Sequence, residues 1–210
     1  MMKHLFRYAL AVASIIIGGE NAMAIEEAKY AVVMKDNRVE IRDYMPYILA
    51  ETIVEGDMEG AGNTAFSRLF GYISGKNRSQ SKIAMTAPVV QEPASQKIAM
   101  TAPVVQEADE SGWRVAFVVP AEYSWETAPE PNDPSVSLRL VPERTVAAVR
   151  FSGTWGEDRF VNHEGKLRAH LAEHGLQPVG EAVYARYNPP FTPWFMRRNE
   201  VLIPVAAAGE

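Results

Sequence analysis

NTAFSRLFGYISG, residues 63–75, contains the periodicity that decides the fold class. Its large apolar side chains recur at i, i+3, i+4 and i+7, which places them on one face of an α-helix: Phe66, Leu69, Phe70 and Ile73. Asn63 is of a type that caps helix N-termini, and Gly75 is typical of the position just past a helix end. The stretch therefore predicts an amphipathic helix over 64–74, with the Gly-rich segment 59–62 as a break before it.

The segments outside this helix have the apolar and β-branched patterns of strands. Three lie before it and one after it, over 30–34, 38–43, 47–54 and 113–119. Asp36-Asn37, between the first two, predicts a hairpin turn. The same order recurs in the second half of the chain: strands over 136–141 and 145–151, a helix from Gly156 to His174, and strands over 183–187 and 200–205. We therefore expect an α+β fold, a distorted antiparallel β-barrel of two pseudo-symmetric halves, each with one long helix packed on the sheet.

Residues 1–24 have the composition of a secretory signal peptide. Lys3 and Arg7 form a basic start, an apolar run follows over 8–18, and Ala22-Met23-Ala24 is a small-x-small cleavage pattern. The run is shorter than the roughly 20 apolar residues that span a bilayer. We expect an exported, periplasmic, monomeric protein with one domain over 25–210 and no membrane span once the signal peptide is removed. A retained amphipathic anchor is the alternative.

The charge and the cysteine content of the chain exclude several classes of function. The chain has 21 basic and 26 acidic side chains and no cysteine. An acidic, unclustered pattern argues against nucleic-acid binding, which needs a basic surface. The lack of cysteine excludes thiolate metal sites, CxxC redox chemistry and covalent haem attachment through CxxCH. The sequence also contains neither a GxSxG nor a Walker motif, so we expect a binding protein and not an enzyme.

One phrase occurs twice: residues 82–92 and 97–107 are both KIAMTAPVVQE. In one interpretation, a single copy is the strand that the fold needs and the other is a tolerated insertion, since loop-closure entropy grows slowly with length. In another, the two copies form an added antiparallel hairpin. A third places Met85 and Met100 in one apolar pocket as an adaptable thioether pair.

Several stretches together resemble the SOUL/haem-binding protein family. The resemblance begins with YISGKNRSQSKIAMTAPV (72–89) and extends to four other blocks in order: VEIRDY (39–44), VAFVVPAEY (115–123), PEPNDPSV (129–136) and ARYNPPFTPWFMRRNEVLIPV (185–205). It covers nearly all of residues 30–205 and implies a bacterial, exported member of that family. It also implies a distorted β-barrel with two long helices, and non-catalytic, non-covalent binding of haem b or a porphyrin in an apolar cleft along the first helix.

Candidate binding residues follow from that implied cleft. Its apolar wall would consist of Phe66, Leu69, Phe70 and Ile73 on the helix, with Met85 and Met100 opposite. Arg68 is the one cation within the helix and could meet a propionate. The competing interpretation is that the stripe packs the core and that the arginine is solvated. Some relatives carry a histidine, proposed as the axial ligand, where this chain has Asp43, which puts ligation of that type in doubt.

After the signal peptide, the sequence contains three histidines, all in or at the end of the second helix: His163, His170 and His174. On one helical edge they could hold a divalent metal. The alternative is a polar flank beside the apolar stripe, with His174 favoured near a helix C-terminus. If haem binds, its iron is held by a Met, by a Tyr, or by no side chain, with burial alone retaining the porphyrin.

Two functions from different classes remain. The first is a module that reversibly binds a tetrapyrrole. The second keeps the fold but is a protein-interaction or scaffold module with a vestigial cleft, whose partner binds the proline-rich loop 120–134 or the duplicated segment.

Overall fold

The computed structural model describes residues 25–80 and 95–206. The first half of the chain forms β1 (Tyr30–Asp36), β2 (Val39–Tyr44), β3 (Tyr47–Val54), α1 (Met58–Ile73), β4 (Asn77–Arg78), β5 (Val104–Asp109) and β6 (Gly112–Val118). The second half forms β7 (Glu130–Pro131), β8 (Ser137–Val141), β9 (Arg144–Phe151), α2 (Glu157–Glu173), β10 (Val183–Arg186), the short 3-10 helix η1 (Trp194–Met196) and β11 (Asn199–Pro204). The predicted strands and their order are confirmed, including the β1–β2 hairpin, where Asn37 takes a positive φ of 53°.

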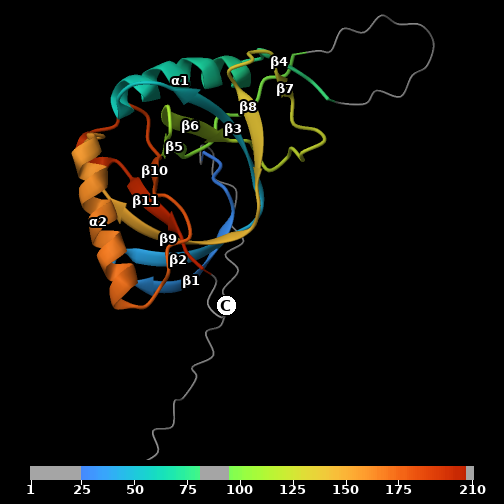
Figure 1. The fold of residues 1–210 in the computed structure, drawn as a ribbon. Helices are drawn as coiled ribbons and strands as arrows, with labels where there is room; N and C mark the ends of the chain where they lie inside the picture. Colours follow the sequence, from blue (N-terminus) through green and yellow to red (C-terminus); the bar gives the residue numbers. More distant parts are fainter. Residues whose placement is uncertain (1–24, 81–94, 207–210) are drawn as a thin grey trace, which may run out of the picture.

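Nine of these strands form one antiparallel sheet that curls into a half-barrel (Figure 1). Its order is β1-β2-β9-β11-β10-β5-β6-β3-β8. Outward from the central β10–β5 pair, the order is symmetric: β11 matches β6, β9 matches β3, and β2 matches β8. The helices follow the same symmetry, because α1 packs on β3 and β6 while α2 packs on their counterparts β9 and β11. The two predicted pseudo-symmetric halves are therefore present, with β1 added at one edge.

Helix α1 differs from the prediction at its N-terminus and in its buried face. It begins at Met58, six residues early, because Asp57 and not Asn63 caps it: the Gly60 N–H donates to Asp57 Oδ1 at 2.8 Å. The residues that face the core are Met58, Ala61, Ala65, Leu69, Tyr72 and Ile73. Phe66 and Phe70 lie beside this face and remain 41% and 46% exposed. Small residues on the packed face let the helix approach the sheet closely, which the pattern of large apolar residues could not indicate.

Helix α2 matches the prediction closely. It runs from its N-cap Gly156 to the C-cap His174, and Gly175 follows with a φ of 68°. Its buried face consists of Phe160, Leu167 and Leu171, all fully enclosed against the sheet.

The second copy of the duplicated phrase is part of the core. Ile98 and Ala102 are buried, and the hydroxyl of Thr101 donates a hydrogen bond to the carbonyl of Val118. The end of this copy lies in β5, which pairs with β10 on one side and β6 on the other. Both edges of β5 are thus occupied, so the interpretation in which the two copies pair as a hairpin does not hold along β5. The first copy, with Met85, lies outside the described residues.

Deleting residues 82–96 leaves one copy of the phrase and is expected to change the free energy of unfolding by no more than about 1 kcal/mol. Asn77 holds the backbone of Gln96 through bonds of 2.8 and 2.9 Å, and in the shortened chain Ser81 would precede the phrase in its place. Urea denaturation of both chains measures the difference. A loss of several kcal/mol would show that the first copy also carries core contacts.

The predicted signal peptide, residues 1–24, also lies outside the described residues. Within residues 25–80 and 95–206, neither helix is both long and apolar enough to cross a bilayer.

Candidate ligand-binding cleft

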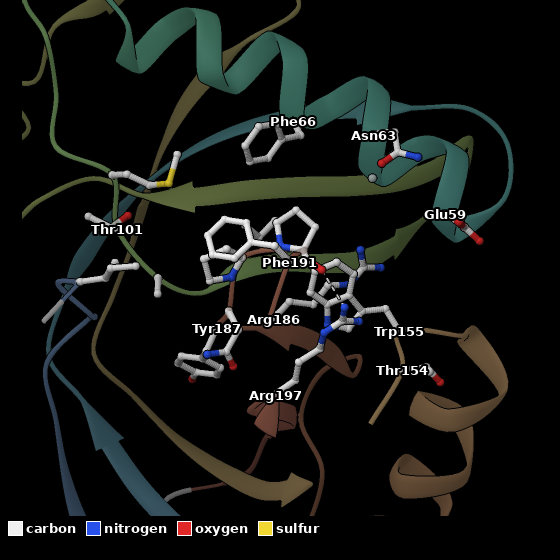
Figure 2. A pocket seen from close by; sticks show the side chains of 18 of the residues that line it. Glu59, Asn63, Phe66, Thr101, Thr154, Trp155, Arg186, Tyr187, Phe191 and Arg197 are labelled. Carbon is white, nitrogen blue, oxygen red and sulfur yellow. Dashed lines mark hydrogen bonds between the residues drawn. The ribbon is translucent and has the colours of Figure 1, made fainter. Parts of the chain in front are cut away.

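A cleft with a volume of about 830 Å³ lies between the N-terminal half of α1 and the segment that follows β10 (Figure 2). This volume is near the upper end of the roughly 300–1,000 Å³ that ligand pockets occupy. Its apolar lining comes from five parts of the chain: Ile25; Phe66 on α1; Met100, Ala102 and Val104 from the second phrase; Trp155; and Pro189, Pro190 and Phe191. The polar lining consists mainly of Glu59, Asn63, Thr101, Thr154, Arg186, Asn188 and Arg197.

Two exposed aromatic side chains face each other across this cleft. Figure 2 shows Phe191 between Phe66 on α1 and the residues Arg186 and Tyr187 of the opposite wall. Phe191 is 85% exposed, and Phe66 packs edge-on against Phe117 with ring centroids 5.6 Å apart. Pro189-Pro190 stiffens the backbone before Phe191, since proline fixes φ. The cleft therefore offers two flat aromatic surfaces that water still reaches.

Arg186 is the strongest electrostatic feature of the cleft. In the described part of the chain, no hydrogen bond or ion pair to its guanidinium is found, and its Nε is enclosed without a partner. Burial lowers the pKa of Arg186 to about 10, against a smaller opposing effect of the Glu59 charge. Gly62 of α1 lies beside the guanidinium, since a Cβ there would be 3.4 Å from Arg186 Nη1, an ordinary van der Waals contact. A desolvated cation without a counter-ion favours an anionic ligand.

Arg197 and Trp155 form the wall beside Arg186. The Arg197 guanidinium lies 4.2 Å from the Trp155 ring centroid and that of Arg186 lies 5.5 Å away, so both make cation–π contacts. Arg197 also donates to the carbonyls of Thr192 and Pro190, both at 2.8 Å, which ties down the loop that carries Phe191. Trp155 is fixed in turn by a 3.0 Å bond from its Nε1 to Asn199 Oδ1.

Few side chains in the cleft could ligate a metal ion at the centre of a porphyrin. No histidine is among the described residues that line it. Tyr187 lines it, but its hydroxyl donates to Glu200 Oε2 at 2.8 Å, and burial raises its pKa well above the usual value, which disfavours a phenolate ligand. Met100 is the one described methionine in the lining, and the residue is 43% exposed.

Only some of the residues predicted for the binding site line the cleft. Phe66 and Met100 line the cleft, whereas Leu69 and Ile73 are buried in the core formed by α1 and the sheet. Phe70 stacks on Phe66 at 5.8 Å but is not part of the lining.

Arg68 lies away from the cleft as well. Its Nη1 donates to Thr52 Oγ1 at 3.1 Å and to the Ile53 carbonyl at 3.2 Å, so it anchors α1 to β3. Asp43 is exposed on β2 and accepts a 2.7 Å bond from Thr145, outside the cleft lining. The family's proposed position for an axial ligand therefore has neither a histidine nor access to this cleft.

Arg186, Arg197 and Trp155 were not predicted from the sequence. Both arginines lie in the block 185–205 that carries the family resemblance, and Arg186 lies inside the predicted strand 183–187, where its neighbours Ala185 and Tyr187 are buried. A charged residue between apolar residues of a predicted strand was the signal in the sequence that could have identified Arg186.

Comparison with known proteins is consistent with these features. A family model described as "SOUL heme-binding protein" matches residues 25–95 and 91–204, and each matched stretch contains one complete copy of the duplicated phrase. Heme-binding protein 2 from Mus musculus and from Homo sapiens are each 31% identical to this chain over 173 residues, which covers 77% of this chain and 78% of each relative.

Solved structures share the fold at much lower identity. The C-terminal domain of EcmrR matches with a TM-score of 0.55 and 12% identity, covering 80% of this chain and 96% of that domain. A hydrolase from Listeria innocua matches with a TM-score of 0.50 and 11% identity, covering 83% and 94% of the two chains. At such identities these two structures bear on the fold alone.

Proposed function

The chain belongs to the SOUL heme-binding protein family, and from that membership we propose that it reversibly binds a free tetrapyrrole, haem b or an iron-free porphyrin, in the cleft beside α1. Binding is non-covalent and non-catalytic, so the protein acts as a carrier or buffer. The proposal includes export to the periplasm, which is supported by the signal-peptide-like composition of residues 1–24.

The observation that carries this proposal is the unpaired guanidinium of Arg186 within an apolar cleft. A tetrapyrrole with propionates is a flat apolar molecule with carboxylates at one edge. Arginine recognises a carboxylate through two parallel hydrogen bonds, and such a bond is stronger where water is excluded. The cleft thus presents the two chemistries that this ligand class needs, in adjacent positions.

The aromatic side chains support the same ligand class. Phe66 and Phe191 are exposed on facing sides of the cleft, where covering them with a flat ring system removes apolar surface from water. The guanidinium groups of Arg186 and Arg197 both contact the Trp155 ring, and these contacts help to fix the position of the two cations. Porphyrin contacts would therefore come from the phenyl rings, and propionate contacts from Arg186.

Iron adds little to binding in this proposal. A thioether is a soft ligand with weak preference for ferric iron, and Tyr187 is already bonded to Glu200. Burial of the ring and pairing of the propionates therefore carry the affinity. Haem would supply iron redox chemistry when bound, but the residues described here serve to bind and orient it.

Iron-free protoporphyrin IX is accordingly expected to bind within about tenfold of haemin, a difference of less than about 1.4 kcal/mol. Met100→Leu, which keeps the volume of the side chain but removes its sulfur, is expected to leave both affinities nearly unchanged. Soret absorbance and porphyrin fluorescence titrations measure this on protein recovered from the periplasmic fraction, whose mass also shows whether it begins at Ile25.

Two outcomes would contradict the proposal. A haemin preference of a hundredfold or more that disappears in Met100→Leu would assign the iron to that sulfur. A signal that rises linearly without saturation for both ligands, as it does with an unrelated acidic protein, would show that the protein does not bind tetrapyrroles specifically.

A further inference from the structure

A second group of chemically active side chains lies at the opposite end of α2 from the cleft. The tip of β1 reaches the C-terminal end of α2 (Figure 1), and there Asp36 meets His170 and His174. One potential ligand atom from each of the three residues lies within 4.8 Å of the others. None of the three lines the cleft.

The two histidines are arranged as a helical i, i+4 pair. Their rings stack with centroids 4.1 Å apart, and His174 Nδ1 lies 2.8 Å from the carbonyl oxygen of His170. A carbonyl can only accept a hydrogen bond, so His174 Nδ1 carries a proton, and in the neutral ring Nε2 then offers the lone pair. A backbone carbonyl that fixes the tautomer in this way is the usual support of a metal-binding histidine.

His170 has the unsatisfied atom of the group. Its Nε2 is enclosed without a hydrogen-bond partner, although its side chain is 17% exposed. The nearest carboxylate oxygen, Asp36 Oδ2, is 3.9 Å away, too far for a hydrogen bond. The other oxygen, Asp36 Oδ1, accepts a 2.9 Å bond from Asn37 Nδ2, which orients the carboxylate. An imidazole nitrogen without a hydrogen bond and a carboxylate oxygen therefore face the same small space.

We propose that Asp36, His170 and His174 bind one divalent transition-metal ion, with zinc or copper as the preferred metals. Two imidazole nitrogens and one carboxylate oxygen suit these metals and do not suit Mg²⁺ or Ca²⁺, which take oxygen ligands. Two i, i+4 histidines on one helical face are the spacing that holds zinc in HExxH helices, and here the β1–β2 hairpin supplies the third ligand. A bound ion would join the hairpin to α2.

His163 does not belong to this group, although the sequence placed it on the same helical edge. Its ring stacks on Phe151 at a centroid distance of 3.9 Å, and its Nδ1 bonds the Arg159 carbonyl at 2.8 Å. It therefore serves as a matched control: a histidine on the same helix, fixed by the same kind of backbone bond, without a second histidine or a carboxylate in its group.

Calorimetric titration of the full protein, without a polyhistidine tag, with ZnCl₂ and with CuCl₂ tests the proposal. We expect one equivalent to bind, the affinity to fall at least about tenfold in His174→Ala and in Asp36→Asn, and His163→Ala to stay within about twofold of the unchanged protein. The ion should also raise Tm in the unchanged protein and in His163→Ala, but not in His174→Ala.

Equal losses in His163→Ala and His174→Ala would show binding to scattered surface histidines and would overturn the proposal. So would the absence of saturable binding of either metal in the unchanged protein. Circular dichroism of each variant confirms that a lost affinity is not a lost fold.

Discussion

Replacing Glu200 by alanine is expected to destabilise the fold by about 3–5 kcal/mol, because it removes the fully buried partner of Arg42 and leaves that arginine only Glu40, which lies nearer the surface. Glu200 is fully enclosed on β11, and its partner Arg42 on β2 is 3% exposed. The two make a two-point ion pair, with Arg42 Nη1 2.7 Å from Oε2 and Nη2 3.1 Å from Oε1.

Other buried groups also depend on this carboxylate. Glu200 also accepts bonds from the Tyr187 hydroxyl at 2.8 Å and from Arg198 Nε at 3.0 Å. The structure places Glu200 at the centre of a buried charge network between β2, β11 and the residue that follows β10. Since Tyr187 also lines the cleft, the network holds one cleft wall in place.

Urea denaturation of Glu200→Ala, with Arg78→Ala as control, measures this effect. Arg78 pairs with Glu130 at 3.1 Å on the surface, and both side chains are more than half exposed, so its loss is expected to cost less than about 1 kcal/mol. A similar small loss for Glu200→Ala would show that water or a rearranged side chain replaces the carboxylate, which would contradict the network as described.

The same carboxylate links stability to pH. Burial alone would raise the pKa of Glu200, but the hydrogen bonds and charges of Arg42 and Arg198 hold it below the ordinary value of 4.5. A carboxyl whose pKa is lower in the folded state contributes stability above its unfolded pKa, and that stability is lost as the pH falls through the folded pKa. The contribution should therefore be intact at neutral pH and decline below about pH 4.5, more steeply in the unchanged protein than in Glu200→Ala.

Local patterns were sufficient for most of the fold. Alternation and turn residues located the strands, and recurrence of strands and helix predicted two halves. The start of α1 was missed because Gly60 and Gly62 suggest a break, whereas a capping carboxylate and close packing against the sheet hold them in the helix. Such tertiary contacts override a local preference, and no pattern within the segment records them.

The sites depend on contacts between distant segments, so the sequence indicated them only in part. Phe66 was correctly grouped with apolar neighbours, but helical periodicity could not tell the core side of the stripe from its cleft side. Whether Arg186 is paired depends on which carboxylates the fold brings near it. Asp36 appeared only as a turn residue, because its proximity to His170 exists only after the hairpin has packed beside α2.

Arg186→Met is expected to change stability and binding in opposite directions. Without ligand, the side chain is a desolvated cation that has cation–π contacts but no hydrogen bond or ion pair within the described residues, so an apolar residue of similar length should raise the free energy of unfolding by about 1–2 kcal/mol. With haemin, the same change removes the cation that pairs with a propionate, and affinity should fall about 30-fold, or about 2 kcal/mol.

Comparing haemin with its dimethyl ester separates that pairing from general damage to the cleft. The unchanged protein should prefer the free acid by about 30-fold, while Arg186→Met should bind acid and ester about equally. Arg150→Met, an exposed arginine on β9 outside the cleft, is the control and should alter neither stability nor preference. An Arg186→Met protein that is less stable, yet still prefers the free acid, would show that Arg186 holds the cleft together and that another group binds the propionate. If Arg186→Met loses both stability and the preference for the free acid, the role of Arg186 is structural. A guanidinium that serves to bind an anion should instead lower the stability of the ligand-free protein, so its removal should raise that stability.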